Sequence, residues 1–215
     1  MKIAHLSDLH ADLDPLWHID QDAEAVVLTG DFFPNATRGV RHIEEHYQDH
    51  WFRQNRSAIF APLRDRPVIV VDGNHDFVEL GALMTKYGYQ GEVHTISHDK
   101  VTQFRGLRWA GHRNIPWICG EWNGELRTPE MQRVVREVFD STRPADVLVT
   151  HCPPAGFLSG PWGCSVLYSA LAYMQHTFRW MFCGHVHNHG GQSVETAFGT
   201  TIYNSATTIQ NLLIE

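Results

Sequence analysis

The chain has 215 residues, of which 43% are hydrophobic and 19% charged, and its formal net charge at pH 7 is −7. This length suits one domain with a full hydrophobic core, so we expect a single domain over residues 1–215. The negative charge argues against a broad basic surface and hence against extended nucleic-acid binding. No apolar stretch reaches the roughly 18 residues of a membrane-spanning helix, and polar residues at Asp8 come too early for a signal peptide. We therefore expect a cytoplasmic protein without a membrane partner.

Hydrophobic periodicity and turn residues predict strands and helices that alternate along the chain, as in an α/β fold. Five apolar runs are typical of strands buried on both faces: residues 2–7, 25–29, 68–71, 146–150 and 179–183. Helices are predicted at 37–61, 78–87, 129–140 (with Thr128 as N-cap) and 164–176. Short strands are expected between 92 and 110 and near 192–197, 200–204 and 208–213. The stretch 111–127, rich in Trp, Gly and Pro, reads as irregular.

Histidine is the unusually frequent residue type, with 15 in the chain, whereas the cysteines form no CxxC pair. This cysteine spacing does not fit a zinc–thiolate site, and a disulfide framework is not expected at this chain length. We expect four buried free thiols, at Cys119, Cys152, Cys164 and Cys183.

Each of the five apolar strands is followed directly by side chains that bind metals. In chain order they are Asp8 and His10, Asp31, Asn74 to Asp76, His151, and His185 with His187. Ligands bind at the carboxyl ends of strands in open α/β sheets, so we expect these side chains to meet. Carboxylate, imidazole and amide donors without thiolates suit Mn, Fe, Zn or Ni. Glycines stand beside three of the blocks, at Gly30, Gly73 and Gly184, where they allow tight turns.

The five blocks Asp8-x-His10, Gly30-Asp31, Gly73-Asn-His-Asp76, His151 and Gly184-His-x-His187 resemble the pattern of the calcineurin-like metallophosphoesterase superfamily. The resemblance spans residues 8 to 187. It implies a four-layer α/β/β/α sandwich with two metal ions at the sheet ends. Asp8, His10 and His187 would hold one metal, and Asn74, His151 and His185 the other, with Asp31 bridging. His75 would be the proton donor to the leaving group, and Asp76 would orient His75.

The activity that the resemblance implies is hydrolysis of phosphate esters by in-line attack of a metal-bridging hydroxide. We expect two Mn²⁺ ions, with Fe, Zn or Ni as alternatives. The segment Gly30-Asp-Phe-Phe-Pro-Asn35 departs from the GDxVDRG of protein Ser/Thr phosphatases. Residues 69–75, 147–156 with 163–164, and 202–206 are similar to small metallophosphoesterase-domain proteins that cleave phosphodiesters and cyclic nucleotides. Phosphodiesters of nucleotide type are therefore the favoured small-molecule substrates.

Substrate contacts are expected from Asn74 and His75 in the third block and from Arg113 and Trp117 in the irregular stretch, where a Trp can stack on a base and an Arg can meet phosphate. His112, Asn114 and Trp122 lie in the same stretch, and sealing a loop against the core is the plainer role for such tryptophans. A stripe of histidines on the first predicted helix is expected to be a solvated face: His42, His46 and His50.

Three other functions remain open on the same residues. A phosphomonoesterase would use the same metal ligands, and a nuclease would need a phosphate track that the charge of −7 disfavours. A protein-binding scaffold of the same fold would have no need of His75 and a full ligand set, both of which are present. The sequence does not indicate the oligomeric state.

Overall fold

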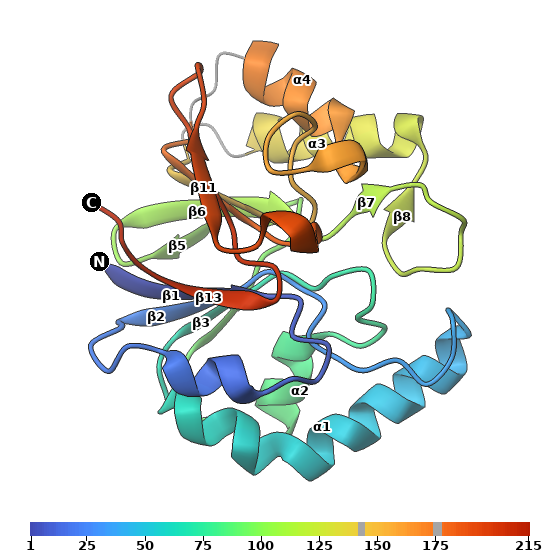
Figure 1. The fold of residues 1–215 in the computed structure, drawn as a ribbon, viewed down its shortest axis with the longest axis vertical. Helices are drawn as coiled ribbons and strands as arrows, with labels where there is room; N and C mark the ends of the chain where they lie inside the picture. The colour runs from blue at the N-terminus through green and yellow to red at the C-terminus, as the bar shows by residue number, and fades with distance from the viewer. Residues whose placement is uncertain (142–144, 174–177) are drawn as a thin grey trace.

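In the computed structural model, which describes residues 1–141, 145–173 and 178–215, two β-sheets lie face to face and helices cover both outer faces (Figure 1). The first sheet has five strands in the order β13-β1-β2-β3-β4. Its members are β1 (Lys2–Ser7), β2 (Ala25–Leu28), β3 (Val68–Val70), β4 (Val93–Thr95) and β13 (Thr208–Leu213). Neighbours among β1 to β4 pair in parallel, and β13 pairs with β1 in the antiparallel direction.

The second sheet has six strands in the order β11-β12-β10-β9-β6-β5. They are β5 (Thr102–Phe104), β6 (Leu107–His112), β9 (Val147–Thr150), β10 (Trp180–Cys183), β11 (Gln192–Glu195) and β12 (Thr201–Asn204). The four inner strands pair in parallel, and β5 and β11 are antiparallel edges. Within the stretch predicted to be irregular, β7 (Ile115–Pro116) and β8 (Glu125–Leu126) form a small parallel pair.

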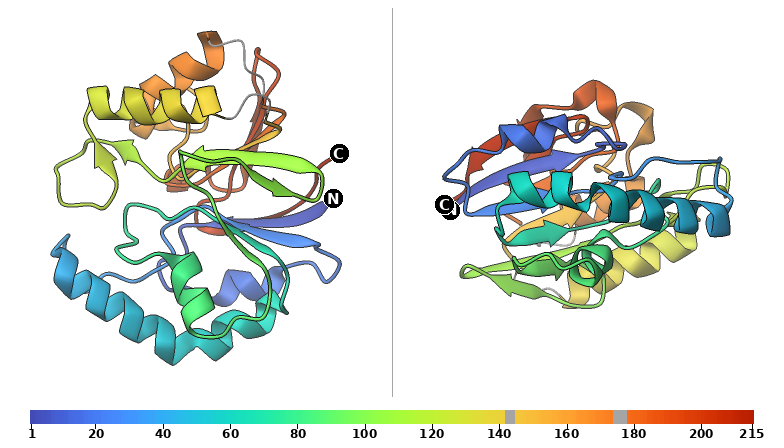
Figure 2. Two further views of the ribbon diagram at one scale, coloured as in Figure 1. Left: turned by 180° about the vertical axis from the view of Figure 1, so that it is seen from behind. Right: turned by 90° about the horizontal axis from the view of Figure 1, so that it is seen from below.

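Among the described residues, the outer layers consist of four α-helices: α1 (Arg41–Leu63), α2 (Leu80–Lys86), α3 (Thr128–Ser141) and α4 (Ser165–Tyr173). Figure 2 shows α1 and α2 on the side of the first sheet and α3 and α4 on the side of the second. Short 3₁₀ turns are η1 (Asp14–His18), η2 (Gly160–Trp162) and η3 (His187–His189). The sequence therefore predicted the α/β/β/α sandwich correctly, and the part of the last predicted helix at 174–176 lies outside the described residues.

The start of α1 differs from the prediction, because the helix begins at Arg41 rather than at residue 37. The backbone N–H groups of Ala36 and Thr37 donate instead to the buried carboxylate of Glu44, at 2.9 and 2.7 Å. The Glu44 side chain, from the first turn of the helix, thus accepts the backbone N–H groups of the preceding residues and holds these residues as a loop. This loop lies beside the strand ends.

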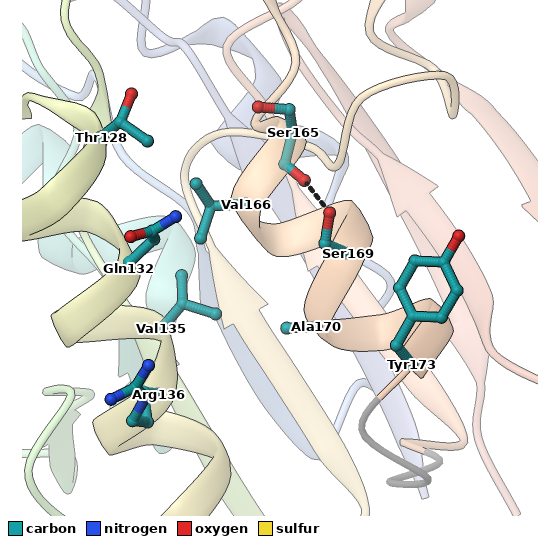
Figure 3. A pocket seen from close by; sticks show the side chains of 9 residues that line it. All are labelled: Thr128, Gln132, Val135, Arg136, Ser165, Val166, Ser169, Ala170 and Tyr173. Carbon is teal, nitrogen blue, oxygen red and sulfur yellow. Dashed lines mark hydrogen bonds between the residues drawn. The ribbon is translucent and has the colours of Figure 1, made fainter.

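Three hydrophobic clusters fill the spaces between the four layers, and the one between the two sheets holds them together. Its centre is Trp109 of β6, which is fully buried and stacks on Phe182 of β10 with ring centroids 6.1 Å apart. On the outer side of the second sheet, α3 and α4 pack against each other and leave a cavity of about 440 Å³ between them (Figure 3). No predicted metal ligand lines this cavity.

None of the helices in the described part of the chain has the length and apolar character needed to cross a membrane.

Trp109→Ala should lower the free energy of unfolding by about 3–5 kcal/mol, because it empties the centre of the layer between the sheets. Urea denaturation followed by circular dichroism measures the change. Trp17→Ala is the matched control, since Trp17 is 61% exposed and its loss should cost less than about 0.5 kcal/mol. Equal, small effects of the two variants would contradict the central position of Trp109.

Candidate metal centre

The predicted ligands meet at one end of the sandwich, where the carboxyl ends of strands from both sheets come together. β1, β2 and β3 of the first sheet lead into the first three blocks, and β9 and β10 of the second sheet lead into the last two. Because the inner strands of each sheet run parallel, all five blocks emerge on the same side. Side chains separated by up to 179 positions in the sequence are thus brought into contact.

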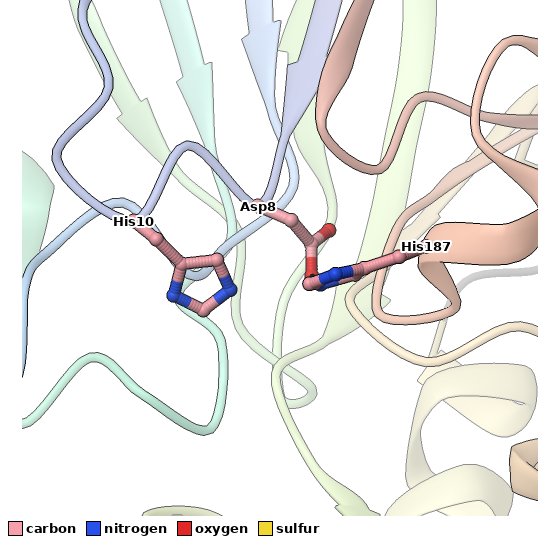
Figure 4. A group of neighbouring side chains, drawn as sticks. All are labelled: Asp8, His10 and His187. Atoms are coloured by element: carbon pink, nitrogen blue, oxygen red, sulfur yellow. Dashed lines mark hydrogen bonds and ion pairs between the residues drawn. The ribbon is translucent and has the colours of Figure 1, made fainter.

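One group of possible metal ligands consists of Asp8, His10 and His187, whose donor atoms all lie within 4.8 Å of one another (Figure 4). Nε2 of His187 is 3.2 Å from Oδ1 of Asp8, and the rings of His10 and His187 are 5.4 Å apart between centroids. The other carboxylate oxygen of Asp8 accepts hydrogen bonds from the Ser7 hydroxyl at 2.6 Å and the His185 backbone N–H at 2.8 Å. These bonds fix the carboxylate and leave Oδ1 directed at the histidines.

The second group consists of Asp31, His151 and His185, again within 4.8 Å of one another, and Asn74 joins them. Three atoms surround Nε2 of His151: Oδ1 of Asn74 at 3.1 Å, Oδ2 of Asp31 at 3.2 Å and Nδ1 of His185 at 3.2 Å. The carboxylate of Asp31 also links the two groups, since its Oδ2 lies 3.9 Å from Nε2 of His10.

The donor set fits divalent cations, because lone pairs converge on a common point. Nδ1 of His151 lies 2.7 Å from the carbonyl oxygen of Thr29, which can only accept, so Nδ1 carries the proton. In the neutral ring Nε2 is then an acceptor, and it faces the amide oxygen of Asn74 and the carboxylate of Asp31. Buried acceptors that face one another need a metal ion or an added proton between them. Carboxylate, imidazole and amide donors without thiolates suit Mn, Fe, Zn or Ni.

The electrostatics of the protein without bound metal point to the same need. Burial disfavours a charge on His151, but the adjacent carboxylate of Asp31 outweighs burial and raises the pKa of His151 to about 10. Burial alone would raise the pKa of Asp31, yet the imidazole of His151 holds it well below its usual range. A proton on His151 therefore takes the place that a metal ion would fill.

Left-handed backbone occurs at four of the candidate ligands. Positive φ angles occur at Asp8 (55°), His10 (44°), Asp31 (54°) and His185 (66°). Each left-handed residue other than glycine costs on the order of 1 kcal/mol, and such strain typically marks functional sites. Gly184 permits a close approach, because a Cβ at this position would collide with Oδ2 of Asp8.

His75 lies beside the two groups, but the expectation that Asp76 orients its ring is wrong. Both carboxylate oxygens of the buried Asp76 accept backbone N–H bonds, from Phe32 and Phe33 on one oxygen and Gly73 on the other. Burial, followed by the charges of Asp31 and Asp72, raises the pKa of Asp76 to about 7. Asp76 thus ties together the loops after β2 and β3.

Asn35 contacts the His75 ring instead, with its Oδ1 2.6 Å from Nδ1. The only signal in the sequence is a polar residue four positions after Asp31. Ser7, which holds Asp8, likewise carries no distinctive signal, because a serine in a strand is common.

The predicted contacts from the loop between β6 and α3 fall in different places. Arg113 contacts the segment after β3, with Nη1 3.7 Å from the Asp72 carboxylate and Nη2 donating to the Asp76 carbonyl oxygen at 3.3 Å. Trp117 is 44% exposed, and the guanidinium of Arg127 lies 4.1 Å from its ring centroid. Trp122 is the aromatic residue at the site, because its ring lies 4.2 Å from that of His75 between centroids.

Other expectations concern residues away from the strand ends. His5 is fully buried in β1, and His112 is buried in β6. The histidines on α1 are exposed, as expected: His42, His46 and His50. The expectation of four buried thiols is wrong for Cys119, which is exposed in the loop between β7 and β8.

Comparisons with known proteins agree with this geometry. A sequence profile described as calcineurin-like phosphoesterase matches residues 1–189. One solved structure superposes with a TM-score of 0.67 at 16% identity, covering 94% of this chain and 89% of its own. No curated protein sequence matches significantly.

Two further solved structures share the fold. The protein TT1561 of Thermus thermophilus has a TM-score of 0.58 at 16% identity, with 94% of this chain and 87% of that one covered. A dimetal phosphatase from Danio rerio has a TM-score of 0.57 at 13% identity, with coverages of 95% and 86%.

The chain belongs to the calcineurin-like phosphoesterase family, and it is a metal-dependent hydrolase of phosphate esters. The family depends on two metal ions, and the structure provides two groups of candidate ligands for them.

Metal affinity should rise with pH. In protein stripped of metal, His151 keeps its extra proton below about pH 10, so a metal ion must displace that proton. Raising the pH removes this competitor, and affinity should increase by up to about tenfold per pH unit for one released proton. Calorimetric titration with Mn²⁺ at pH 6.5, 7.2 and 8.0 measures the slope. The exposed-histidine variant His42→Ala should show the same slope, and an affinity independent of pH would contradict the assignment.

Proposed function

We propose that this chain hydrolyses phosphodiesters, with nucleotide-type substrates favoured, at a centre that holds two divalent cations. The observation that carries the proposal is the pair of ligand groups joined by Asp31, with the imidazole of His75 beside them. Asp8, His10 and His187 would hold one cation. The other would be held by Asn74, His151 and His185, with Asp31 shared between the two. Bound cations would activate water and neutralise charge on the phosphate.

The chain's own residues would orient the ester and manage the proton. Nε2 of His75 lies 4.0 Å from Oδ2 of Asp31, so this nitrogen faces the ligand groups rather than the protein interior. We assign His75 as the group that protonates the departing oxygen when the P–O bond breaks. Asn74 and His75 would also contact the phosphate. Asp76 would contribute by holding the loop that carries them, and Arg113 would support that loop through its contacts with Asp72 and the Asp76 carbonyl oxygen.

The preference for diesters is supported by how the arginines around His75 are paired. A monoester carries one more negative charge than a diester, and a free guanidinium would favour it. Arg113 lies 3.7 Å from Asp72, Arg38 lies 3.3 Å from Glu121, and Arg41 lies 3.2 Å from Glu45. Each of these three cations already has a carboxylate partner. The similarity of residues 69–75, 147–156 and 202–206 to phosphodiester-cleaving proteins supports the same choice.

A phosphomonoesterase is the second candidate, because the neighbour from Danio rerio is described as a dimetal phosphatase. Mn²⁺ as the native metal and a cytoplasmic location are part of the proposal for either substrate class.

Turnover of bis-p-nitrophenyl phosphate should exceed that of p-nitrophenyl phosphate on metal-stripped protein resupplied with Mn²⁺. The ratio of kcat/KM should be about tenfold or more in favour of the diester, which corresponds to a difference of roughly 1.4 kcal/mol in activation free energy. The physical reason is the extra negative charge of the monoester, which meets arginines that are already paired. Metal-stripped protein without Mn²⁺ is the control and should be inactive. A reversed ratio would establish the monoesterase, and binding of two metals without activity on either ester would establish a scaffold.

A further inference from the structure

The imidazole of His75 is held in one tautomer by Asn35. Oδ1 of Asn35 lies 2.6 Å from Nδ1, and Nδ2 of the same amide donates to the backbone carbonyl oxygen of His75 at 3.1 Å. Because that carbonyl can only accept, the amide nitrogen must face it, and the amide oxygen must face the ring. Nδ1 therefore carries a hydrogen in both the neutral and the charged ring. Nε2 is left as the nitrogen that exchanges a proton.

One face of the same ring is covered by Trp122. The two rings are 4.2 Å apart between centroids and inclined by 35°. The guanidinium of Arg38 lies 5.8 Å from the Trp122 ring centroid and pairs with Glu121 at 3.3 Å. Trp122 thus restricts rotation of His75 about its side-chain bonds, while Asn35 fixes the edge of the ring.

The loop that carries Trp122 is itself fixed by a carboxylate. Glu125 accepts backbone N–H bonds at 2.8–3.0 Å, from Ile118, Cys119, Gly120 and Trp122. Asn123 then fastens the loop to the third block, since its backbone N–H donates to the Asn74 carbonyl oxygen at 3.0 Å. The position of Trp122 relative to His75 is therefore set by a loop that its own hydrogen bonds hold in place.

The loop that carries Asn35 is fixed in the same manner from α1. Glu44 accepts the N–H groups of Ala36 and Thr37, as described above. The buried side chain of Gln48 donates to the carbonyl oxygens of Pro34 at 3.2 Å and His75 at 2.7 Å. The contacts of Asn35 and Trp122 with the His75 ring thus come from loops with their own internal support.

We propose that Asn35 and Trp122 are positioning residues that aim Nε2 of His75 at the oxygen of the departing alcohol. This inference rests on the proposed phosphodiesterase function. When the P–O bond breaks, the proton on Nε2 passes to the departing oxygen, and the ring keeps its Nδ1 hydrogen on Asn35. Water supplies the oxygen that replaces the alcohol on phosphorus, and solvent returns the proton to Nε2. Neither residue contacts the phosphate in this step.

The test compares two diesters that share a phosphoryl group and differ in leaving group, methyl p-nitrophenyl phosphate and methyl phenyl phosphate. Protonation matters little for p-nitrophenolate and much for phenolate. Asn35→Leu should lower kcat by about 10²-fold with the phenyl ester and by less than about tenfold with the p-nitrophenyl ester. Asn35→Asp keeps an acceptor oxygen and should recover most of the loss. Trp122→Ala should show the same selective loss, and Trp122→Phe should recover it.

Mn²⁺ affinity is the second readout and should be unchanged in all four variants, because neither residue belongs to the ligand groups. Trp17→Ala, at a tryptophan 61% exposed on η1, is the matched control and should retain both activities. Equal slowing of the two esters by folded Asn35→Leu and Trp122→Ala would overturn the inference and leave the proposed function intact. Turnover of neither diester by the unaltered enzyme would overturn the proposed function and this inference with it.

Discussion

The structure depends on one constraint, the convergence of buried acceptor atoms that only a cation can satisfy. Around Nε2 of His151, a carboxylate oxygen, an amide oxygen and a second imidazole nitrogen lie at 3.1–3.2 Å. Without a metal ion, an added proton on the His151 ring takes that place, held there by the carboxylate of Asp31. The two packed sheets and the close glycines hold the ligands in position. Metal binding and the stability of this end of the sandwich are therefore linked.

Much of this arrangement could be predicted from the sequence, because its elements carry local signals. Runs such as Val68–Val70 identify strands buried on both faces, and parallel strands deliver their carboxyl ends to one edge. The blocks after those strands consist of residue types that bind divalent ions. The structure brings Asp8 together with His10 and His187, and Asp31 together with His151 and His185. The four layers follow from the same alternation of strands and helices.

What could not be predicted depends on contacts between loops. The family resemblance implied that Asp76 orients His75, but the Asp76 oxygens accept backbone N–H groups from the loop after β2 and from its own loop after β3. Asn35, which is 40 positions away in the sequence, makes the contact with the His75 ring. Trp117 and Trp122 look alike in the sequence, and only the folded loop around Glu125 distinguishes the exposed one from the one that lies on His75. These contacts are determined by tertiary packing, which leaves no periodic pattern in the sequence.

The most direct test of the central claim is a Mn²⁺ titration of the stripped protein, with bound metal and diester turnover measured on the same samples. The proposal predicts that about two equivalents bind per chain, that turnover requires both, and that Asp31→Ala binds at most one and is inactive, since Asp31 of the second group also lies next to His10 of the first and would be shared between the two cations. Asp22→Ala, at a carboxylate whose side chain is 59% exposed, should behave like the unaltered enzyme. Full activity with a single equivalent, or with Asp31→Ala, would contradict a centre built on two cations.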